Sequence, residues 1–164
     1  MSRKLLFTSL GLAVMLSASV SAEAADIIGR ASVIDGDTID IHGTRIRFDG
    51  VDAPESRQSC VDAAGKPYRC GKVSAEALDV FLSESRPVSC RRTGRDHNRI
   101  VAICTRADGT DVNRWLVSNG HAIDWPKYSK GRYANEQRQA RTAKLGIWSG
   151  TFIPPCVIRG ARCE

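Results

Sequence analysis

Two short segments near the start of the chain alternate polar with apolar residues, as expected of strands that bury one face. They are Thr38–Ile41 and Arg45–Phe48, and together they predict a hairpin. The branched residues of Ile27–Ile34 predict another strand before it. Asp35–Thr38 predicts the turn between the first two strands, in which Gly36 is free to adopt a positive φ. This part of the chain therefore predicts three consecutive strands.

The next stretch predicts loops followed by a helix. Gly50–Glu55 leaves the third strand as a stiff, proline-containing loop, and the polar segment Cys60–Gly71 predicts a surface loop. Helical spacing with one apolar face then begins, and Pro87 ends it near Arg86. The residues with this spacing are Val73, Ala77, Val80, Phe81 and Glu84.

The second half of the chain predicts two more strands and two helices. Val88–Cys90 and Ile100–Cys104 predict paired strands, joined by a basic loop over Arg91–Arg99. We expect a short helix from Asp111 or Asn113 to Val117, ended by Gly120, and a last helix over Ala134–Lys144, capped by Gly146. Five strands and about three helices indicate an α+β domain built on a small β-barrel, although the pattern alone fits several kinds of barrel.

The N-terminus has the pattern of a secretory signal peptide. Arg3 and Lys4 precede an apolar run from Leu5 to Leu16 that ends in small residues and is too short to span a bilayer. A buried N-terminal helix is the alternative, but it leaves the charged start unexplained. We expect a signal peptide over residues 1–24, one domain over 25–150 and an irregular tail over 151–164. A periplasmic or secreted protein without a membrane anchor follows, and we expect a monomer.

All six cysteines lie beyond this leader, an even number in an oxidising compartment. Proximity along the chain and the predicted strands favour three disulfides, although fifteen pairings are possible in principle. The favoured pairs are Cys60 with Cys70, Cys90 with Cys104, and Cys156 with Cys163. Zinc binding is the rival explanation, but no Cys-x-x-Cys pair exists and the three histidines are scattered.

The chain is basic, with 24 Lys and Arg against 18 Asp and Glu, a formal net charge of +6. Such a surface attracts polyanions, including nucleic acid and anionic membranes. The signal is weak by itself, because many exported proteins are basic.

Candidate chemistry lies in the two loops that flank the predicted hairpin. Asp37, Asp52 and Glu55 occupy these loops, and Arg47 lies on the return strand. Two carboxylates and a backbone carbonyl suit a hard cation such as Ca²⁺. A third carboxylate can act as general base, and Arg47 with Arg99 can neutralise charge on phosphorus. Composition alone also produces such pairs by chance.

Three segments are similar to the signature segments of the thermonuclease (staphylococcal nuclease-like) family. They are Val33–Ile39, Ile46–Glu55 and Asn98-Arg99, and the similarity continues over roughly Ile28 to Ser149. The resemblance implies a five-stranded oligonucleotide-binding (OB) barrel that cleaves DNA and RNA. It also implies an endonuclease that prefers single strands and leaves 3′-phosphates.

Carried over by position, the resemblance implies a role for each candidate residue. Asp37, Asp52 and the carbonyl of Ala53 are expected to bind Ca²⁺, Glu55 to act as general base, and two arginines to hold the phosphate. The arginines are Arg47 and Arg99.

The family's base-flanking tyrosines have no clear counterparts in this chain. Trp125 or Tyr128 could stack on a base, and Lys127 could contact phosphate, although core packing of Trp125 and a solvated loop explain these residues as well. Asp35 could support the cation site or only cap its turn. A non-catalytic OB-fold nucleic-acid-binding module and a disulfide-rich inhibitor or structural protein are the competing functions.

Overall fold

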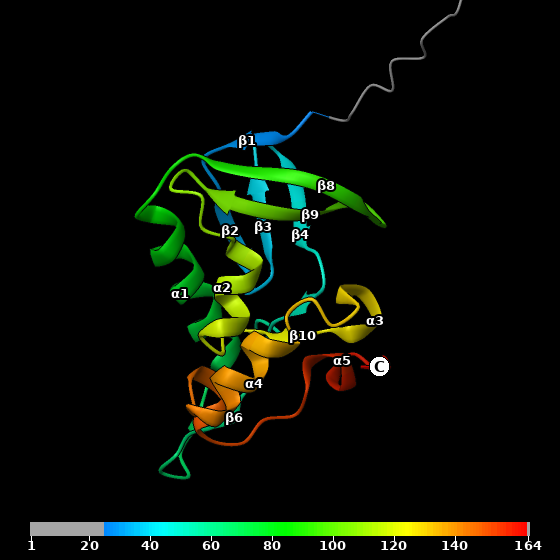
Figure 1. Ribbon diagram of the computed structural model, residues 1–164. Coiled ribbons are helices and arrows are strands. Elements are labelled where there is room, and N and C mark those ends of the chain that lie inside the picture. Colours follow the sequence, from blue (N-terminus) through cyan, green and yellow to red (C-terminus); the bar gives the residue numbers. More distant parts are fainter. Residues whose placement is uncertain (1–24, 164) are drawn as a thin grey trace, which may run out of the picture.

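The computed structural model describes residues 25–163, and their fold is α+β with a mixed six-stranded sheet (Figure 1). The sheet order is β1-β8-β9-β4-β3-β2, and β4 pairs in parallel with β9, in register from Ile46 and Ile100. The other neighbouring strands are antiparallel. The predicted signal peptide, residues 1–24, lies outside the described part of the chain.

The first three predicted strands form the antiparallel half of the sheet. β3 (Thr38–Ile41) matches the prediction, and β4 (Thr44–Phe48) begins one residue early. The predicted strand over 27–34 is wrong as a single element, because it is divided into β1 (Ile27–Gly29) and β2 (Ser32–Asp35). β1 pairs with β8 and β2 pairs with β3, so two strands separated by only two residues form opposite edges of the sheet.

The predicted basic loop over residues 91–99 is wrong. β8 (Val88–Asp96) and β9 (Arg99–Arg106) form one long hairpin with a tight turn at His97 and Asn98. Backbone pairing continues through polar residues here, with an irregularity in register between Arg92 and Gly94. Sequence alternation did not reveal these strands because most of their side chains from 91 to 95 are exposed.

Helix α1 (Cys70–Ser83) was predicted, but only part of its buried face was: Phe81 is buried as expected. Val73 and Val80 are 45% and 60% exposed, whereas Ser74 and Leu78 are buried. The polar Ser74 can lie inside because its hydroxyl donates to the backbone carbonyl of His121, at 2.7 Å. The buried stripe therefore lies beside the one that apolar spacing predicted.

The helices over 112–118 and 134–142 confirm the remaining helix predictions, with differences at their ends. α2 (Val112–Ser118) is capped by the side chain of Asp111, whereas α4 (Ala134–Thr142) is followed by Lys144 with φ of 54°. Gly146 does not cap α4, because it begins a 3-10 helix, η1 (Gly146–Ser149). Two single-turn helices add to the three expected ones, α3 (Pro126–Ser129) and α5 (Pro155–Ile158).

Four two-residue strands form small pairs outside the main sheet. β5 (Val51–Asp52) pairs with β10 (Ile123–Asp124), and β6 (Cys60–Val61) pairs with β7 (Pro67–Tyr68). The segment predicted as an irregular loop over 60–71 is therefore a small hairpin that leads into α1.

The main core lies between the sheet and helices α1 and α2, and fully buried side chains such as Ile39, Ile46, Leu78 and Leu116 form it. A second cluster of buried residues lies near the C-terminal segment and includes Trp125, Ile147 and Cys156. All three predicted disulfides are confirmed: Cys60–Cys70, Cys90–Cys104 and Cys156–Cys163. No helix within residues 25–163 combines the length and apolar character needed to cross a membrane.

Candidate functional site

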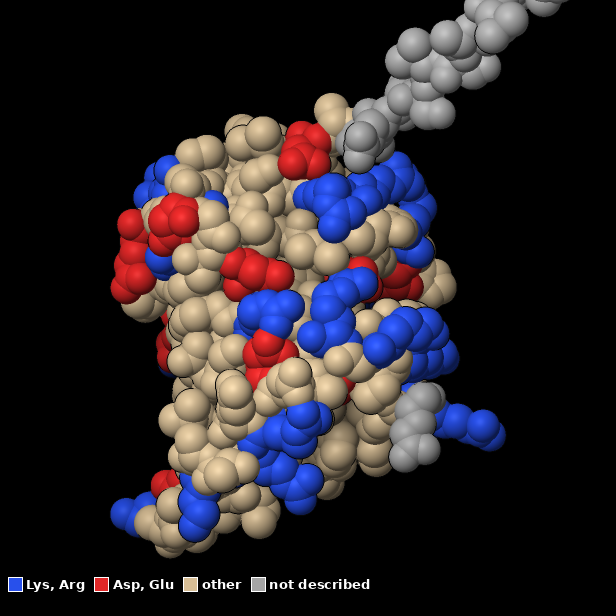
Figure 2. Space-filling view, in the orientation of Figure 1, with Lys and Arg blue, Asp and Glu red and all other residues tan. Residues whose placement is uncertain are grey.

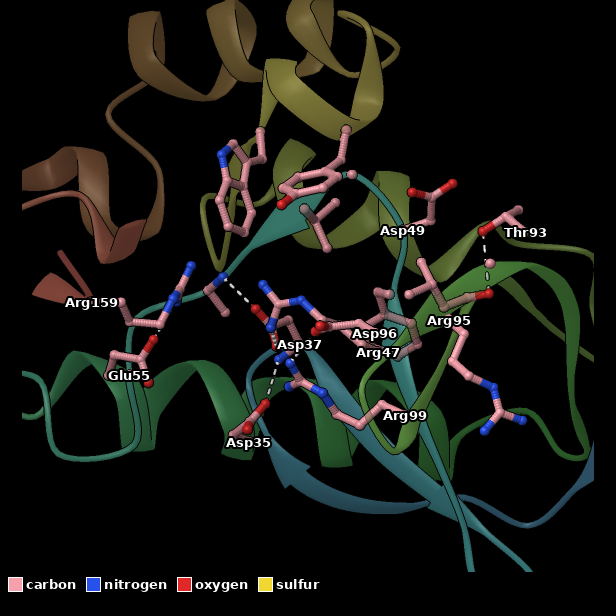
Figure 3. A pocket seen from close by; sticks show the side chains of 18 of the residues that line it. Asp35, Asp37, Arg47, Asp49, Glu55, Thr93, Arg95, Asp96, Arg99 and Arg159 are labelled. Carbon is pink, nitrogen blue, oxygen red and sulfur yellow. Dashed lines mark hydrogen bonds and ion pairs between the residues drawn. The ribbon is translucent and has the colours of Figure 1, made fainter. Parts of the chain in front are cut away.

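A cleft of about 650 Å³ opens beside the turns at one end of the sheet (Figure 3). Its walls come from segments far apart in the chain: the β2–β3 turn, the β4–β5 region, the β8–β9 hairpin, the segment around α3 and the C-terminal tail. The charged residues that line it are Asp35, Asp37, Arg47, Asp49, Glu55, Arg95, Asp96, Arg99 and Arg159. Charges of both signs therefore face one solvent-accessible volume.

Two buried carboxylates share one guanidinium: Asp37 and Arg47 line the cleft, whereas Asp52 does not. Arg47 donates from Nη1 to Asp37 Oδ1 at 2.6 Å and from Nη2 to Asp52 Oδ1 at 3.1 Å. The side chains of Asp37 and Asp52 are 5% and 0% exposed, and that of Arg47 is 12% exposed. The predicted convergence of the two acidic loops and Arg47 is thus what the geometry gives.

The β2–β3 turn holds Asp37 in place through close contacts. The backbone N–H of Asp37 donates to Asp35 Oδ1 at 3.0 Å, and that of Ala53 donates to Asp37 Oδ2 at 3.1 Å. A Cβ on Gly36 would lie 2.5 Å from Ser74 Oγ and 2.7 Å from the Cβ of Ala53. Glycine at 36 therefore permits close approach to α1 and to the Ala53 loop; it has no positive φ, contrary to the prediction.

Burial dominates the electrostatics of two of these carboxylates. It raises the pKa of Asp35, and the negative charge of Asp37 adds to the effect. It also raises the pKa of Asp52, while the hydrogen bond and positive charge of Arg159 act in the opposite direction. The second oxygen of Asp52, Oδ2, is buried and has no hydrogen-bond partner.

Arg159, from the C-terminal tail, is a site residue that the sequence did not predict. Its Nη2 donates to Asp52 Oδ1 at 2.5 Å, and its Nη1 donates to Glu55 Oε1. Glu55 and Asp52 therefore share Arg159 as an ion-pair partner, and Glu55 lies beside this arginine (Figure 3). The one sequence signal was the short loop closed by Cys156 and Cys163, which contains Arg159 and Arg162.

Arg99 lines the cleft from the start of β9, but it does not contact Asp37, Asp52 or Glu55. Its Nη2 donates to Asp96 at the opposite end of the tight β8–β9 turn. The side chain is 32% exposed. A phosphate in the cleft would have to draw this guanidinium away from Asp96 or share it.

The predicted substrate-contact residues differ in their positions. Trp125 and Tyr128 line the cleft, with ring centroids 4.6 Å apart in an edge-to-face arrangement. Trp125 is only 8% exposed and also packs in the second core cluster, so core packing is correct for it, and stacking on a base stays a prediction. Lys127 is exposed, does not line the cleft, and lies 5.3 Å from the Tyr128 ring.

The sequence matches the model of a known protein family. The family model described as "Staphylococcal nuclease homologue" matches residues 45–150. The chain belongs to the staphylococcal nuclease family. The match covers Arg47, Asp52, Glu55 and Arg99, whereas Asp37 precedes it and Arg159 follows it.

Two curated relatives of this family member differ in what their names describe. The "Succinoglycan biosynthesis protein ExoI" of Rhizobium meliloti (strain 1021) is 50% identical over 92% of this chain and 80% of its own length. The "Endonuclease YhcR" of Bacillus subtilis (strain 168) is 31% identical over 80% of this chain, which spans only 12% of that protein.

The donor set is small for a metal site. Within residues 25–163 no group of three or more His, Cys, Asp or Glu side chains is arranged to hold a metal ion. Asp37 and Asp52 supply two carboxylates, and the expected site needs only these two and a backbone carbonyl. The buried, unpartnered Oδ2 of Asp52 is an oxygen atom that a hard cation would satisfy.

Proposed function

We propose that this staphylococcal nuclease-family protein is an exported, Ca²⁺-dependent endonuclease that hydrolyses phosphodiester bonds of DNA and RNA. The observation that carries the proposal is the contact of Arg47 with two buried carboxylates at the wall of a cleft that Glu55 and Arg99 also line. Buried charge clusters are expensive to retain compared with apolar residues of similar volume, which favours a functional reason for this cluster.

Asp37, Asp52 and the carbonyl of Ala53 would hold the cation. These hard oxygen donors suit Ca²⁺ better than a soft metal, and the unpartnered oxygen of Asp52 supports the assignment. When bound, Ca²⁺ supplies positive charge to the phosphate oxygens and lowers the pKa of nearby water. Arg47 holds both carboxylates in place, and the Ala53 N–H also holds Asp37.

The remaining roles fall to side chains that face the cleft. Arg47 and Arg99 bind the scissile phosphate and neutralise the charge that develops on it, since a planar guanidinium contacts two oxygens together. Glu55 accepts a proton from the attacking water. The water oxygen bonds to phosphorus, the bond from phosphorus to the 5′ oxygen breaks, and the leaving oxygen takes up a proton. The products carry a 3′-phosphate and a 5′-hydroxyl.

Substrate contacts outside the reacting phosphate would come from the segment around α3. Trp125 and Tyr128 offer aromatic faces at the cleft, and Lys127 lies next to Tyr128. Stacking on such faces requires unpaired bases, which supports a preference for single strands. Lys and Arg side chains on the face shown in Figure 2 add a positive field for a polyanion.

We also propose that the sheet curls into the OB barrel expected of the family. β1 and β2 form opposite edges of the sheet although only Arg30 and Ala31 separate them, which requires the two edges to approach each other. The division into a signal peptide over 1–24, a nuclease domain over 25–150 and a tail over 151–164 belongs to the same proposal, as does the monomeric state. Three disulfides are consistent with an extracytoplasmic location.

The test is digestion of single-stranded DNA and RNA by the purified full chain, with Ca²⁺ or with a chelator, followed by end-group analysis. We expect digestion with Ca²⁺ only, and 3′-phosphate ends. Asp52→Asn should abolish the Ca²⁺-dependent reaction. Asp40→Asn is the matched control, because Asp40 only accepts a hydrogen bond from the Gly43 N–H in an exposed turn. Absence of digestion by the wild-type chain would refute the proposal.

Two other functions remain as candidates for the same experiment. A non-catalytic OB-fold module would bind nucleic acid in a salt-sensitive way without cleaving it. A role in succinoglycan biosynthesis is suggested by the name of the Rhizobium relative at 50% identity. Incubation with succinoglycan, with and without Ca²⁺, separates that candidate from a nuclease.

A further inference from the structure

The C-terminal tail reaches the functional site through a rigid loop. Cys156 is fully buried, and its disulfide to Cys163 closes a loop that contains Arg159. Trp125 Nε1 donates to the carbonyl of Arg162 at 3.3 Å, which fixes the far side of this loop. In Figure 1 the tail, coloured red, returns beside α3 and β10. Arg159 is therefore presented to the cleft by a braced segment.

The guanidinium of Arg159 contacts two acidic side chains of the proposed reaction: Asp52, a proposed cation ligand, and Glu55, the proposed general base. It bonds to Asp52 at 2.5 Å and to Glu55, and it lies 5.1 Å from the centre of the Trp125 ring. Burial alone would lower the pKa of Arg159, but the bonds to Glu55 and Asp52 raise it overall, so the group stays charged.

Arg159 also helps to close Asp52 off from solvent. Asp52 is 0% exposed, and both Arg47 and Arg159 bond to its Oδ1. Each arginine also bonds to a second carboxylate, but Arg47 (12% exposed) bonds to the buried Asp37 (5% exposed), whereas Arg159 (29% exposed) bonds to the more exposed Glu55 (39% exposed). Of the two arginines, Arg159 is thus the one that can leave with less rearrangement.

We propose that Arg159 is an internal competitor of the divalent cation for Asp52, and so sets the Ca²⁺ concentration at which the site fills. The inference rests on the proposed function. A guanidinium on the same carboxylate weakens cation binding in two ways: a displaced Arg159 gives up a charge-assisted hydrogen bond, and a retained one repels the ion. Both lower the affinity, so the direction of the effect does not depend on which occurs.

The experiment is isothermal titration of the full chain with Ca²⁺ at fixed ionic strength, for the wild type and three variants. Arg159→Gln should tighten Ca²⁺ binding by roughly 10- to 100-fold, because one charge-assisted hydrogen bond is removed. Arg159→Lys keeps the charge but lacks the planar fork that bonds to Asp52 and Glu55 together, so its Ca²⁺ affinity should lie between those of the wild type and Arg159→Gln. Arg162→Gln is the matched control, since Arg162 is exposed, lies in the same disulfide loop and carries the same charge.

A second readout is the Ca²⁺ concentration that gives half-maximal hydrolysis, which should fall by the same factor in Arg159→Gln. Unchanged or weaker Ca²⁺ binding in Arg159→Gln, relative to Arg162→Gln, would overturn the inference, because a residue that only positions Asp52 and Glu55 gives that result. The proposed function fails separately, if Asp52→Asn binds Ca²⁺ as the wild type does or if the wild type cleaves no nucleic acid. A thermal melt of each variant shows whether it is folded.

Discussion

Replacement of Arg47 by methionine should destabilise the protein strongly when Ca²⁺ is removed by a chelator. The change removes the guanidinium that Asp37 and Asp52 share, and the side chains of these aspartates are 5% and 0% exposed. Loss of one partner of a buried ion pair typically costs about 3 to 5 kcal/mol. The low end applies here, because Asp52 keeps Arg159 and Asp37 keeps the Ala53 N–H. We therefore expect a loss of about 3 kcal/mol, or about 10 °C in Tm.

The assay is urea denaturation in a chelating buffer, compared with Arg45→Met as the matched control. Arg45 lies two residues earlier on β4 and is exposed, so the same substitution there removes no buried charge pair. Adding Asp37→Asn to Arg47→Met should recover part of the loss, since one uncompensated carboxylate disappears. Addition of Ca²⁺ should stabilise Arg47→Met more than the wild type. A difference below about 1 kcal/mol between the two arginine variants would refute this account of the cluster.

Three further outcomes are expected. Arg99→Ala should lower kcat by roughly 10³ to 10⁵ and Glu55→Gln by roughly 10² to 10⁴, with substrate binding of the glutamine variant nearly unchanged; equal, small losses in steady-state kinetics would contradict the assigned roles. Gly71→Ala should cost roughly 1 to 3 kcal/mol of stability and reduce activity, because the new Cβ would lie 1.8 Å from the Glu55 carbonyl oxygen. Gly94→Ala is the control in a thermal melt: its Cβ would lie 3.9 Å from the nearest neighbour, so stability should change little. Burial lowers the pKa of His121, so protonation favours the unfolded chain and stability should fall as the pH decreases through about 6.5. His121→Asn should flatten that part of the curve of urea midpoint against pH. An unaltered curve would exclude His121 as the cause.

The parts of the fold that depend on local alternation were predictable from the sequence. Thr38–Ile41 was identified with its correct bounds, because its apolar residues alternate and both isoleucines are fully buried. The strand character of residues 91–96 was hidden, because backbone pairing with β9 forms it while most of its side chains stay in solvent. The buried face of α1 was predicted only in part: Phe81 is buried as expected, but Ser74 also lies inside because its hydroxyl is hydrogen-bonded there, which apolar spacing does not show.

The site was predictable as a set of residues and less so as a set of contacts. The sequence predicted that Asp37, Arg47 and Asp52 lie together, because the loops that carry the two aspartates flank the hairpin that carries Arg47. The partners of Glu55 and Arg99 could not be foreseen, since they depend on how the tail and the β8–β9 turn fold. Arg159 lies beyond every motif, and only tertiary folding of its disulfide loop brings it near residue 52.

The parallel pairing of β4 with β9 has a consequence for how the molecule assembles. Ile46 meets Ile100 only after the intervening hairpins and α1 have been synthesised, and contacts between such distant residues form slowly. A chain that is synthesised from its N-terminal end holds β2, β3 and β4 before β9 arrives. Arg159, close to the opposite terminus, emerges later still. The cleft, whose walls include residues of β9 and of the tail, is therefore complete only when almost all of the described chain has been made.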